Sequence, residues 1–220
     1  MTTQIIDRAV APTYDQAMQA VSEVEKSTGQ RTGWNVYTGG AGSAASGWTP
    51  ELVDQLKGAS VPLMAISVPE QDFTDYQRAA NDVYTAVEGL ADFDLLQMPR
   101  LFLDMEAGAT AGDLAENARK YVAWADGLDS SNQKGIYGSP GFLITISADP
   151  AIGSEFWPPS VWVASTFWND PRAENPYDIP DFPEGLWYLP GQRGWQYATA
   201  TVAGMTVDLS VFDDLLVLVS

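Results

Sequence analysis

The sequence predicts an α/β fold, a TIM-type (β/α)8 barrel made by one domain over residues 1–220, and three observations support this. Short apolar runs alternate with segments of helical periodicity, as in β/α units around a parallel sheet. The chain has 220 residues, a length that one barrel domain commonly occupies. Acidic residues stand at the ends of several apolar runs, where parallel strands of one barrel would bring them to a single mouth.

Eight apolar runs are expected to form the strands of this barrel. Strands buried on both faces have near-continuous apolar sequences, and these runs are bounded by polar residues, Gly or Pro. The predicted strands are Thr3–Asp7, Gly33–Thr38, Val61–Val68, Leu101–Met105, Gly135–Gly138, Val161–Ala164, Gly194–Ala198 and Thr206–Leu209.

Helices are predicted between the first five of these strands. Tyr14–Lys26 has apolar residues at helical spacing and is followed by Gly29, a typical helix stop. Thr49 is expected to cap a second helix, with Pro50 in its first turn. The other two helices are expected at Phe73–Leu90 and Ala111–Leu128.

The helical signal weakens after residue 138. Many of the prolines fall in Phe142–Ile152 and Asn169–Pro190, which we expect to be long ordered loops. The C-terminal half of the barrel is therefore predicted to be irregular, with missing or short helices.

The composition excludes several kinds of chemistry. The chain has no Cys and no His, which excludes Ser-His-Asp and Cys-His catalysis and zinc sites built on imidazole. We expect no metal and no cofactor, and carboxylates remain as the main acid–base groups. Eleven basic against 29 acidic residues give a net charge of −18, which disfavours nucleic acid and anionic membranes as partners.

The N-terminus gives an expectation about location. Met1–Asp7 contains no basic region before an apolar stretch, and no segment reaches the roughly 18 apolar residues of a membrane span. We expect a protein without a signal peptide, cytoplasmic when synthesised. Release at lysis or incorporation in a virion would bring it outside the cell.

Four acidic residues are the candidate catalytic groups. Asp104 and Glu106 are the most informative, because side chains two apart on a strand point to the same side, roughly 6.6 to 7 Å apart at the backbone. Neighbouring buried carboxyls can divide into a protonated acid and an anion, as glycoside hydrolysis requires. Asp7 and Asp208 lie in the first and last strands and would face the same mouth. A helix cap or an ion pair with Arg100 also explains an isolated Asp-x-Glu.

The order of these motifs resembles that of a known family. The motifs are Asp7 at the end of the first strand, Leu103–Glu106, Gly135–Ser139, Val161–Ala164, Trp195–Tyr197 and Val207–Leu209. Together they resemble the glycoside hydrolase family 25 lysozymes and the related glycoside-hydrolase-like domains of unknown function from actinobacteria and their phages. The resemblance covers nearly the whole chain, and Tyr37–Gly40 and Val61–Met64 are closer to the second group.

The resemblance implies a muramidase-like glycosidase that cleaves the bond following N-acetylmuramic acid in peptidoglycan. Glu106 would then be the general acid, and Asp104 would stabilise the cationic transition state or a substrate-assisted intermediate. Asp7 and Asp208 would tune and orient that pair.

Aromatic residues in these motifs are candidates for substrate binding, because flat aromatic faces stack on the apolar faces of sugar rings. The candidates are Tyr37, Tyr137, Trp162, Trp195 and Tyr197. Packing inside the barrel is the alternative explanation for Trp162 and Trp195, since both lie in predicted strands.

Two functions stay open at this point. The first is a hydrolase acting on peptidoglycan, either a phage lysin or an actinobacterial wall enzyme. The second is a catalytically weak or inactive barrel that binds glycan or has a structural role in a phage virion or cell surface, beside other virion proteins. Richness in Ala, Gly, Asp and Val, with lysine at only four positions, is typical of actinobacteria and their phages.

Overall fold

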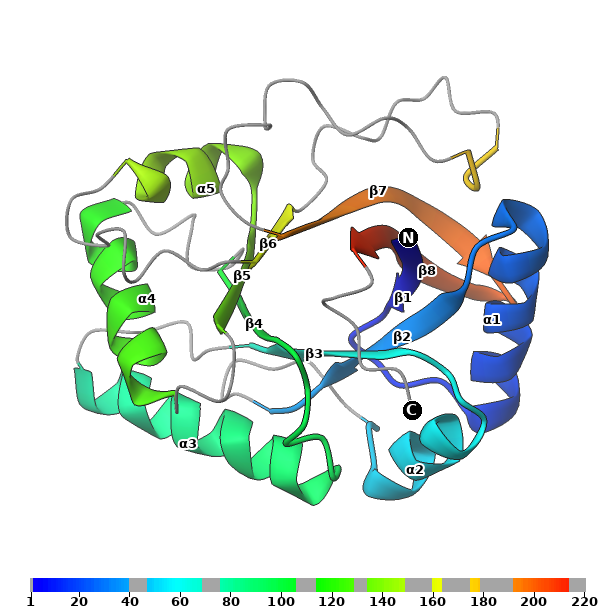
Figure 1. Cartoon of the computed structure of the whole chain (residues 1–220), viewed down its shortest axis with the longest axis horizontal. Helices are drawn as coiled ribbons and strands as arrows, with labels where there is room; N and C mark the ends of the chain where they lie inside the picture. Colours follow the sequence, from blue (N-terminus) through cyan, green and yellow to red (C-terminus); the bar gives the residue numbers. More distant parts are fainter. Residues whose placement is uncertain are drawn as a thin grey trace.

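The computed structural model describes residues 2–39, 47–68, 76–105, 114–128, 134–148, 160–163, 175–178 and 192–213. Its strands are β1 (Thr2–Asp7), β2 (Thr32–Tyr37), β3 (Leu63–Ser67), β4 (Leu101–Asp104), β5 (Lys134–Gly138), β6 (Ser160–Val163), β7 (Gln192–Val202) and β8 (Met205–Asp213). Its helices are α1 (Tyr14–Thr28), α2 (Pro50–Gly58), α3 (Tyr76–Asp92), α4 (Leu114–Gly127) and α5 (Pro140–Ser147). The helices lie outside the ring of strands (Figure 1).

The strands pair in chain order. Strands β1 to β7 are parallel to one another, and β8 lies between β7 and β1, which closes the sheet into a barrel. The strand β8 is antiparallel to both β7 and β1. The predicted α/β fold is confirmed, but the predicted (β/α)8 arrangement of eight parallel strands is corrected to seven parallel strands and one antiparallel strand.

A tight turn explains the change of direction. Residues Ala203 and Gly204 join β7 to β8 with φ angles of 48° and 76°. Two consecutive residues with positive φ are typical of the hairpin turns that match the twist of antiparallel strands. The two strands are also longer than the predicted Gly194–Ala198 and Thr206–Leu209.

Helix signals in the first half of the chain are confirmed. Thr13 and Gln16 form a capping box at the start of α1, with Gln16 N donating to Thr13 Oγ1 at 3.3 Å. Gly29 ends this helix with a left-handed φ of 68°. Thr49 caps α2, and Pro50 is its first residue.

The helix α5 corrects the prediction of a loop at Phe142–Ile152. Ser139 caps this helix by accepting a hydrogen bond from Phe142 N at 3.3 Å, and Pro140 is the first helical residue. The predicted loop Asn169–Pro190 lies outside the described residues except for 175–178.

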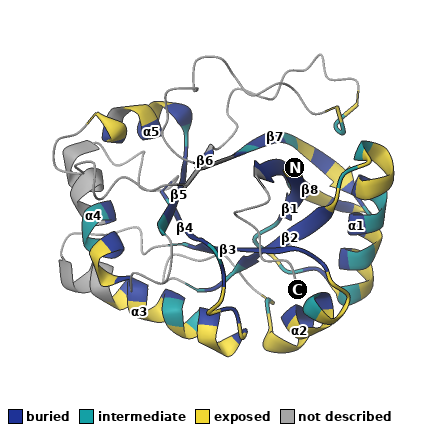
Figure 2. Ribbon diagram, in the orientation of Figure 1, coloured by how far each residue is buried: buried dark blue, intermediate teal, exposed yellow. Residues whose placement is uncertain are grey.

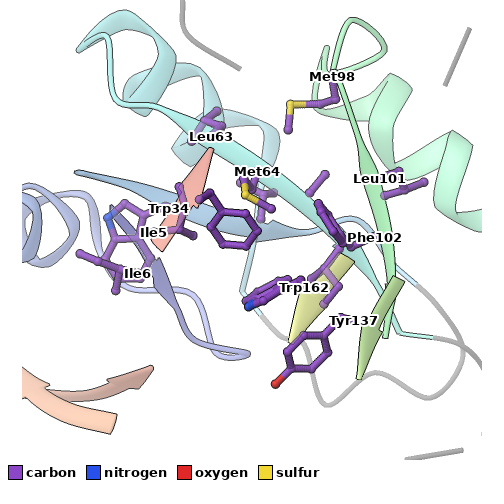
Figure 3. Packing of buried hydrophobic residues seen from close by; sticks show 14 of the residues in the cluster. Ile5, Ile6, Trp34, Leu63, Met64, Met98, Leu101, Phe102, Tyr137 and Trp162 are labelled. Carbon is purple, nitrogen blue, oxygen red and sulfur yellow. The ribbon is translucent and has the colours of Figure 1, made fainter. Parts of the chain in front are cut away.

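Side chains alternate between the inside of the barrel and the layer of helices. On the outer side, Trp34 lies beside Ile6 in register and donates its indole N–H to the carbonyl of Ala17 in α1 at 3.3 Å. On the inner side, the rings of Phe102, Trp162 and Phe212 pack edge to face. Figure 3 shows Phe102 and Trp162 side by side with Tyr137. The helices bury the sides that face the strands and expose their outer sides (Figure 2).

Glycines make room for the inner rings. A Cβ on Gly135 would lie 2.7 Å from the Phe102 ring, and a Cβ on Gly194 would collide with the Phe212 ring. The aromatic rings therefore fill the middle of the barrel, and polar side chains are left for the rim. In the described ranges, no helix is long and apolar enough to span a bilayer.

Candidate active site

Asp7 and Asp208 lie next to each other at one rim of the barrel. Asp7 is the last residue of β1, and its Cα partner in β8 is Asp208. Ser210 bonds Trp162 inside the barrel, and its partner in β1 is Ile5, so both of these residues point inward. Asp208 and Asp7 lie two residues from them along their strands and therefore point inward as well. The structure thus brings together two of the four predicted catalytic residues.

The carboxyl of Asp7 is buried among polar groups. Asn35 Nδ2 donates to Oδ1 at 3.0 Å, and the Tyr37 hydroxyl donates to Oδ2 at 3.4 Å. Burial raises the pKa of Asp7 to about 7, and the negative charges of Asp208 and Asp104 act in the same direction while the two hydrogen bonds oppose it. Asp7 can therefore take up or release a proton near neutral pH.

Asp208 is half-buried and receives donors from β7. The Thr199 hydroxyl donates to Oδ1 at 2.5 Å, and Gln196 also forms a hydrogen bond with the carboxyl. Burial raises the pKa of Asp208, and these two hydrogen bonds oppose the rise. Asp208 thus keeps more of its anionic character than burial alone would allow.

Asp104 ends β4 at the same rim, and Glu106 lies outside the described residues. Asp104 is two residues above the inner Phe102, which places it on the inner side of the strand. Its charge raises the pKa of both Asp7 and Tyr37. Three predicted carboxyls therefore share one electrostatic environment, and the position of Glu106 stays a prediction.

Two of the predicted aromatic residues, Tyr37 and Tyr137, belong to this rim. Tyr37 contacts Asp7, as described above, and burial raises its pKa. The Tyr137 hydroxyl donates to Gln196 Oε1 at 2.8 Å, and both side chains are buried.

Trp162 lies deeper and serves as packing. It is 0% exposed, with ring centroids 4.5 Å from Tyr137 and 5.1 Å from Phe212. Its indole N–H donates to Ser210 Oγ at 3.2 Å. The structure supports the packing explanation for this residue, because its ring faces are covered by other rings.

The structure places Trp195 and Tyr197 away from the inside of the barrel. Gly194 and Gln196 face inward, so Trp195 between them faces outward. A bulge between Gln196 and Ala198 leaves Tyr197 without a partner in β8, and its hydroxyl donates to Gln4 Oε1 at 2.9 Å. These two side chains therefore face the outer side of the barrel, away from the carboxyls at the rim.

Two polar residues of the rim, Asn35 and Gln196, were missed as candidates. Each is a buried amide within an aromatic run, Trp34-Asn35-Val36-Tyr37 and Trp195-Gln196-Tyr197. Strand alternation could have identified Asn35, because it lies two residues before Tyr37. Asn35 Oδ1 is buried and accepts no hydrogen bond from the described residues, so among them it remains an acceptor beside Asp7.

A pocket of about 310 Å³ shares Tyr37 with this site. It is lined by Tyr37, Thr38, Gly39, Trp48, Thr85, Glu88, Gly89, Asp92 and Phe93. Tyr37 thus contacts the buried carboxyl and the pocket at once. Among the described residues, no group of acidic side chains is arranged to hold a metal ion.

Comparisons with known proteins bear on the fold. No protein-family model matches the sequence, and no curated protein matches it. An uncharacterised protein of B. stearothermophilus has a similar structure, with a TM-score of 0.71 and 17% identity over 97% of each chain.

Two similar structures from Streptococcus pneumoniae have described roles. The modular autolysin LytC has a TM-score of 0.64 and 17% identity, covering 96% of this chain and 47% of LytC, and it has also been solved with a synthetic peptidoglycan ligand. GHIP, a glycosyl hydrolase 25, has a TM-score of 0.54 and 14% identity, covering 97% of this chain and 88% of GHIP. At these identities the likeness shows a shared fold, and this chain spans about half the length of LytC.

Proposed function

We propose that this protein is a muramidase-like glycosidase that cleaves the glycan strands of peptidoglycan. The observation that carries the proposal is the register of Asp7 with Asp208 at the rim that Asp104 also reaches. The fold shared with a peptidoglycan-binding autolysin and a glycosyl hydrolase 25 adds support.

The chemistry of the rim suits a reaction in which positive charge develops. Cleavage of a glycosidic bond passes through an oxocarbenium-like transition state. Asp7, Asp104 and Asp208 disfavour one another's ionisation, as the raised pKa of Asp7 indicates. A cationic sugar ring would relieve this repulsion more than a neutral substrate does, so the same carboxyls would stabilise the transition state preferentially.

The roles of the residues follow the family resemblance. Glu106 would protonate the leaving oxygen, and Asp104 would stabilise the cation that forms. Asp7 and Asp208 would set the electrostatic environment of that pair. Asn35 and Tyr37 would hold Asp7 through their hydrogen bonds.

Replacement of the proposed general acid tests the function. Glu106→Gln should reduce release of reducing sugar from purified peptidoglycan by roughly 10²- to 10⁴-fold, since the amide cannot donate a proton to the leaving group. The melting temperature should stay close to that of the parent. Glu51→Gln, at an exposed residue in the first turn of α2, is the matched control and should keep full activity.

Two results would count against the proposal. A Glu106→Gln variant with full activity would remove the general acid from the mechanism. A parent protein that sediments with insoluble peptidoglycan but releases no reducing sugar would favour the non-catalytic glycan-binding barrel.

A further inference from the structure

The pocket that shares Tyr37 with the rim lies between three elements of the fold. Tyr37 ends β2, and Trp48 precedes the cap of α2. Glu88 and Asp92 line the pocket from α3. The helix α3 packs backbone to backbone at this place, because a Cβ on Gly89 would collide with the carbonyl of the residue after Tyr37. The walls of the pocket are therefore set by the packing of the main chain.

Two aromatic side chains of the pocket are held by residues outside it. The Trp48 ring packs edge to face on the buried Trp34, with ring centroids 6.2 Å apart. The Tyr37 hydroxyl lies 3.4 Å from Oδ2 of Asp7. Rings that are already held lose little side-chain freedom when a ligand packs against them. The pocket thus presents aromatic surface at a low entropic cost.

The indole N–H of Trp48 is a donor without an acceptor in the described part of the chain. Its Nε1 atom is buried and bonds to none of the described residues. An indole nitrogen can only donate, and a buried donor left without a partner is costly. A ligand that brings a carbonyl oxygen to Trp48 would supply the acceptor.

The charge of the pocket selects a cation. Glu88 and Asp92 are four residues apart and so share one face of α3. Neither forms an ion pair with a described residue, and no Lys or Arg lines the pocket. Glu88 also bonds the Tyr84 hydroxyl of the same helix, a contact that leaves its charge in place. Carboxylates and the negative faces of aromatic rings both attract an ammonium group.

We propose that this pocket binds a peptide segment that carries a free primary amine. The ammonium group would lie beside Glu88 and Asp92, and a peptide carbonyl would accept from Trp48. A volume of about 310 Å³ is at the lower end of the range for ligand pockets, which suits a short segment of a peptide. A neutral sugar could pack on the rings but would leave the negative charge of the pocket unmatched.

The inference deepens the proposed function, on which the source of the peptide rests. Peptidoglycan carries short peptides on its glycan strands. Because Tyr37 belongs to the pocket and to the rim, a peptide bound there would hold its glycan strand near Asp7. The pocket would then contribute to substrate binding without taking part in the chemical step.

A binding measurement tests the inference without catalysis. The ¹⁵N-labelled protein is titrated with the tripeptide Ala-Lys-Ala, blocked at both ends so that its one amine is on the lysine side chain. The indole N–H signal of Trp48 is followed by NMR, with Trp48→Phe used to assign it. The signal should shift saturably, with a dissociation constant of about 1 mM. The same peptide acetylated on its lysine should bind roughly tenfold more weakly, because it has lost its charge.

Two variants of α3 remove the charges that attract the amine. Glu88→Gln and Asp92→Asn should each weaken binding of the free-amine peptide by roughly two- to fivefold and leave binding of the acetylated peptide unchanged. Both residues are exposed, so both variants should keep the melting temperature of the parent. Glu51→Gln, at an exposed residue of α2 outside the pocket, is the matched control and should bind both peptides as the parent does.

Three results would overturn the inference. The first is equal affinity of the parent for the free-amine and acetylated peptides, a comparison that needs no variant. The second is the absence of a saturable shift with either peptide. The third is a saturable shift with the trisaccharide of N-acetylglucosamine and none with the peptides, which would assign the pocket to a sugar.

Activity separates this inference from the proposed function. A parent that is inactive on peptidoglycan but prefers the free-amine peptide would lose the function and keep the inference. In an active parent, acetylation of the free amines of peptidoglycan should raise KM and leave kcat little changed, and this difference should be smaller in Glu88→Gln. An active parent with the same KM on both substrates would overturn the assignment of the pocket to the peptide of the substrate.

Discussion

The parallel strands and the β7–β8 hairpin bring carboxyls to the same rim from opposite directions. Asp7 and Asp104 are the last residues of β1 and β4, where parallel strands end. Asp208 lies in the first half of β8, which runs the other way. The comparison teaches that pairing between strands decides which residues lie at the mouth of this barrel. A residue can lie there at the end of a parallel strand or inside the antiparallel strand.

The two regions are also held in place differently. Each of β1 to β5 is followed by a helix that covers the barrel. The hairpin turn instead contacts α1 through Glu23, whose two carboxylate oxygens accept from Ala203 N at 3.0 Å and the Tyr177 hydroxyl at 2.7 Å. The hairpin turn is therefore attached to α1 by the Glu23 side chain, whereas β1 to β5 are each covered by the helix that follows them.

Replacement of Asp7, the carboxyl at the end of β1, should have the largest effect on stability. The folded-state pKa of Asp7 lies above its unfolded value, so its favourable contribution is complete below about pH 4 and is lost as pH rises through about 7. The cost of ionising it is at most about 4 kcal/mol. Asp7→Asn should therefore raise the free energy of unfolding by roughly 2 to 4 kcal/mol at pH 8 and leave it unchanged at pH 4, as measured by urea unfolding.

The β8 carboxyl offers a direct comparison. Asp208→Asn should also stabilise the protein at high pH. The gain should be smaller than that of Asp7→Asn, because Asp208 is only half-buried and accepts two hydrogen bonds. Asp126→Asn, at an exposed residue of α4, is the control and should show no such dependence. Equal effects of Asp7→Asn at pH 4 and pH 8 would contradict the raised pKa of the buried Asp7 carboxyl.

Filling the space beside the inner rings should have the next largest effect. Gly194→Ala in the hairpin places a methyl group against the Phe212 ring, and Gly135→Ala in the parallel part does so against Phe102. Each should lower the free energy of unfolding by about 1 to 3 kcal/mol. The Gly194 variant should be the worse, because its contact is closer.

The control for these variants lies in α5. A Cβ on Gly141 would meet no atom of the described residues within 4 Å, so Gly141→Ala should be neutral or stabilise by up to about 1 kcal/mol, because Ala favours the helix. Thermal unfolding of the three variants measures the order. A Gly194→Ala variant as stable as the parent would mean that the Phe212 ring can move aside without loss.

Removal of the hairpin contact with α1 should have a smaller effect. Glu23→Ala deletes both acceptors and should cost roughly 1 to 2 kcal/mol, with faster amide hydrogen exchange at Ala203. Gln19→Ala, at an exposed position of the same helix, should change neither measurement. Exchange at Ala203 that stays as slow as in the parent would show that the turn is held by the strands alone.

Loss of the α5 cap should have the smallest effect. Ser139→Ala removes the acceptor for Phe142 N and should lower the free energy of unfolding by about 1 kcal/mol. Ser139→Asp, which keeps an acceptor, should restore most of it. Equal stability of both variants and the parent would indicate that packing alone fixes the start of α5.

The first half of the fold could be predicted because its local signals agree with its tertiary structure. Thr49 and Pro50 begin α2, and Gly29 ends α1, as their backbone preferences require. α5 was missed because Gly141 and the β-branched residues after it have low helix propensity, although Ser139 and Pro140 give a start signal. Buried Phe142 and Leu143 show that packing decides this helix.

The site was predicted in part, for a similar reason. Asp7 and Asp104 end their strands as expected, whereas Asp208 reaches the rim through an antiparallel register that sequence periodicity does not report. Trp195 and Tyr197 are the prominent residues of their motif, but alternation from the inward Gly194 turns the side chain of Gln196 inward instead. The direction of a strand and the position of a bulge are set by pairing with another strand, which no local pattern contains.

The aromatic rings that fill the barrel also limit how a polymer can be handled. Phe102, Trp162 and Phe212 are 0% exposed and occupy the interior below the carboxyls. In the part of the chain that the structure describes, a long strand cannot thread through the ring of β-strands from one side to the other. A polymeric ligand would have to lie across the open end of the barrel. An internal bond of the polymer would then be as accessible as a terminal one.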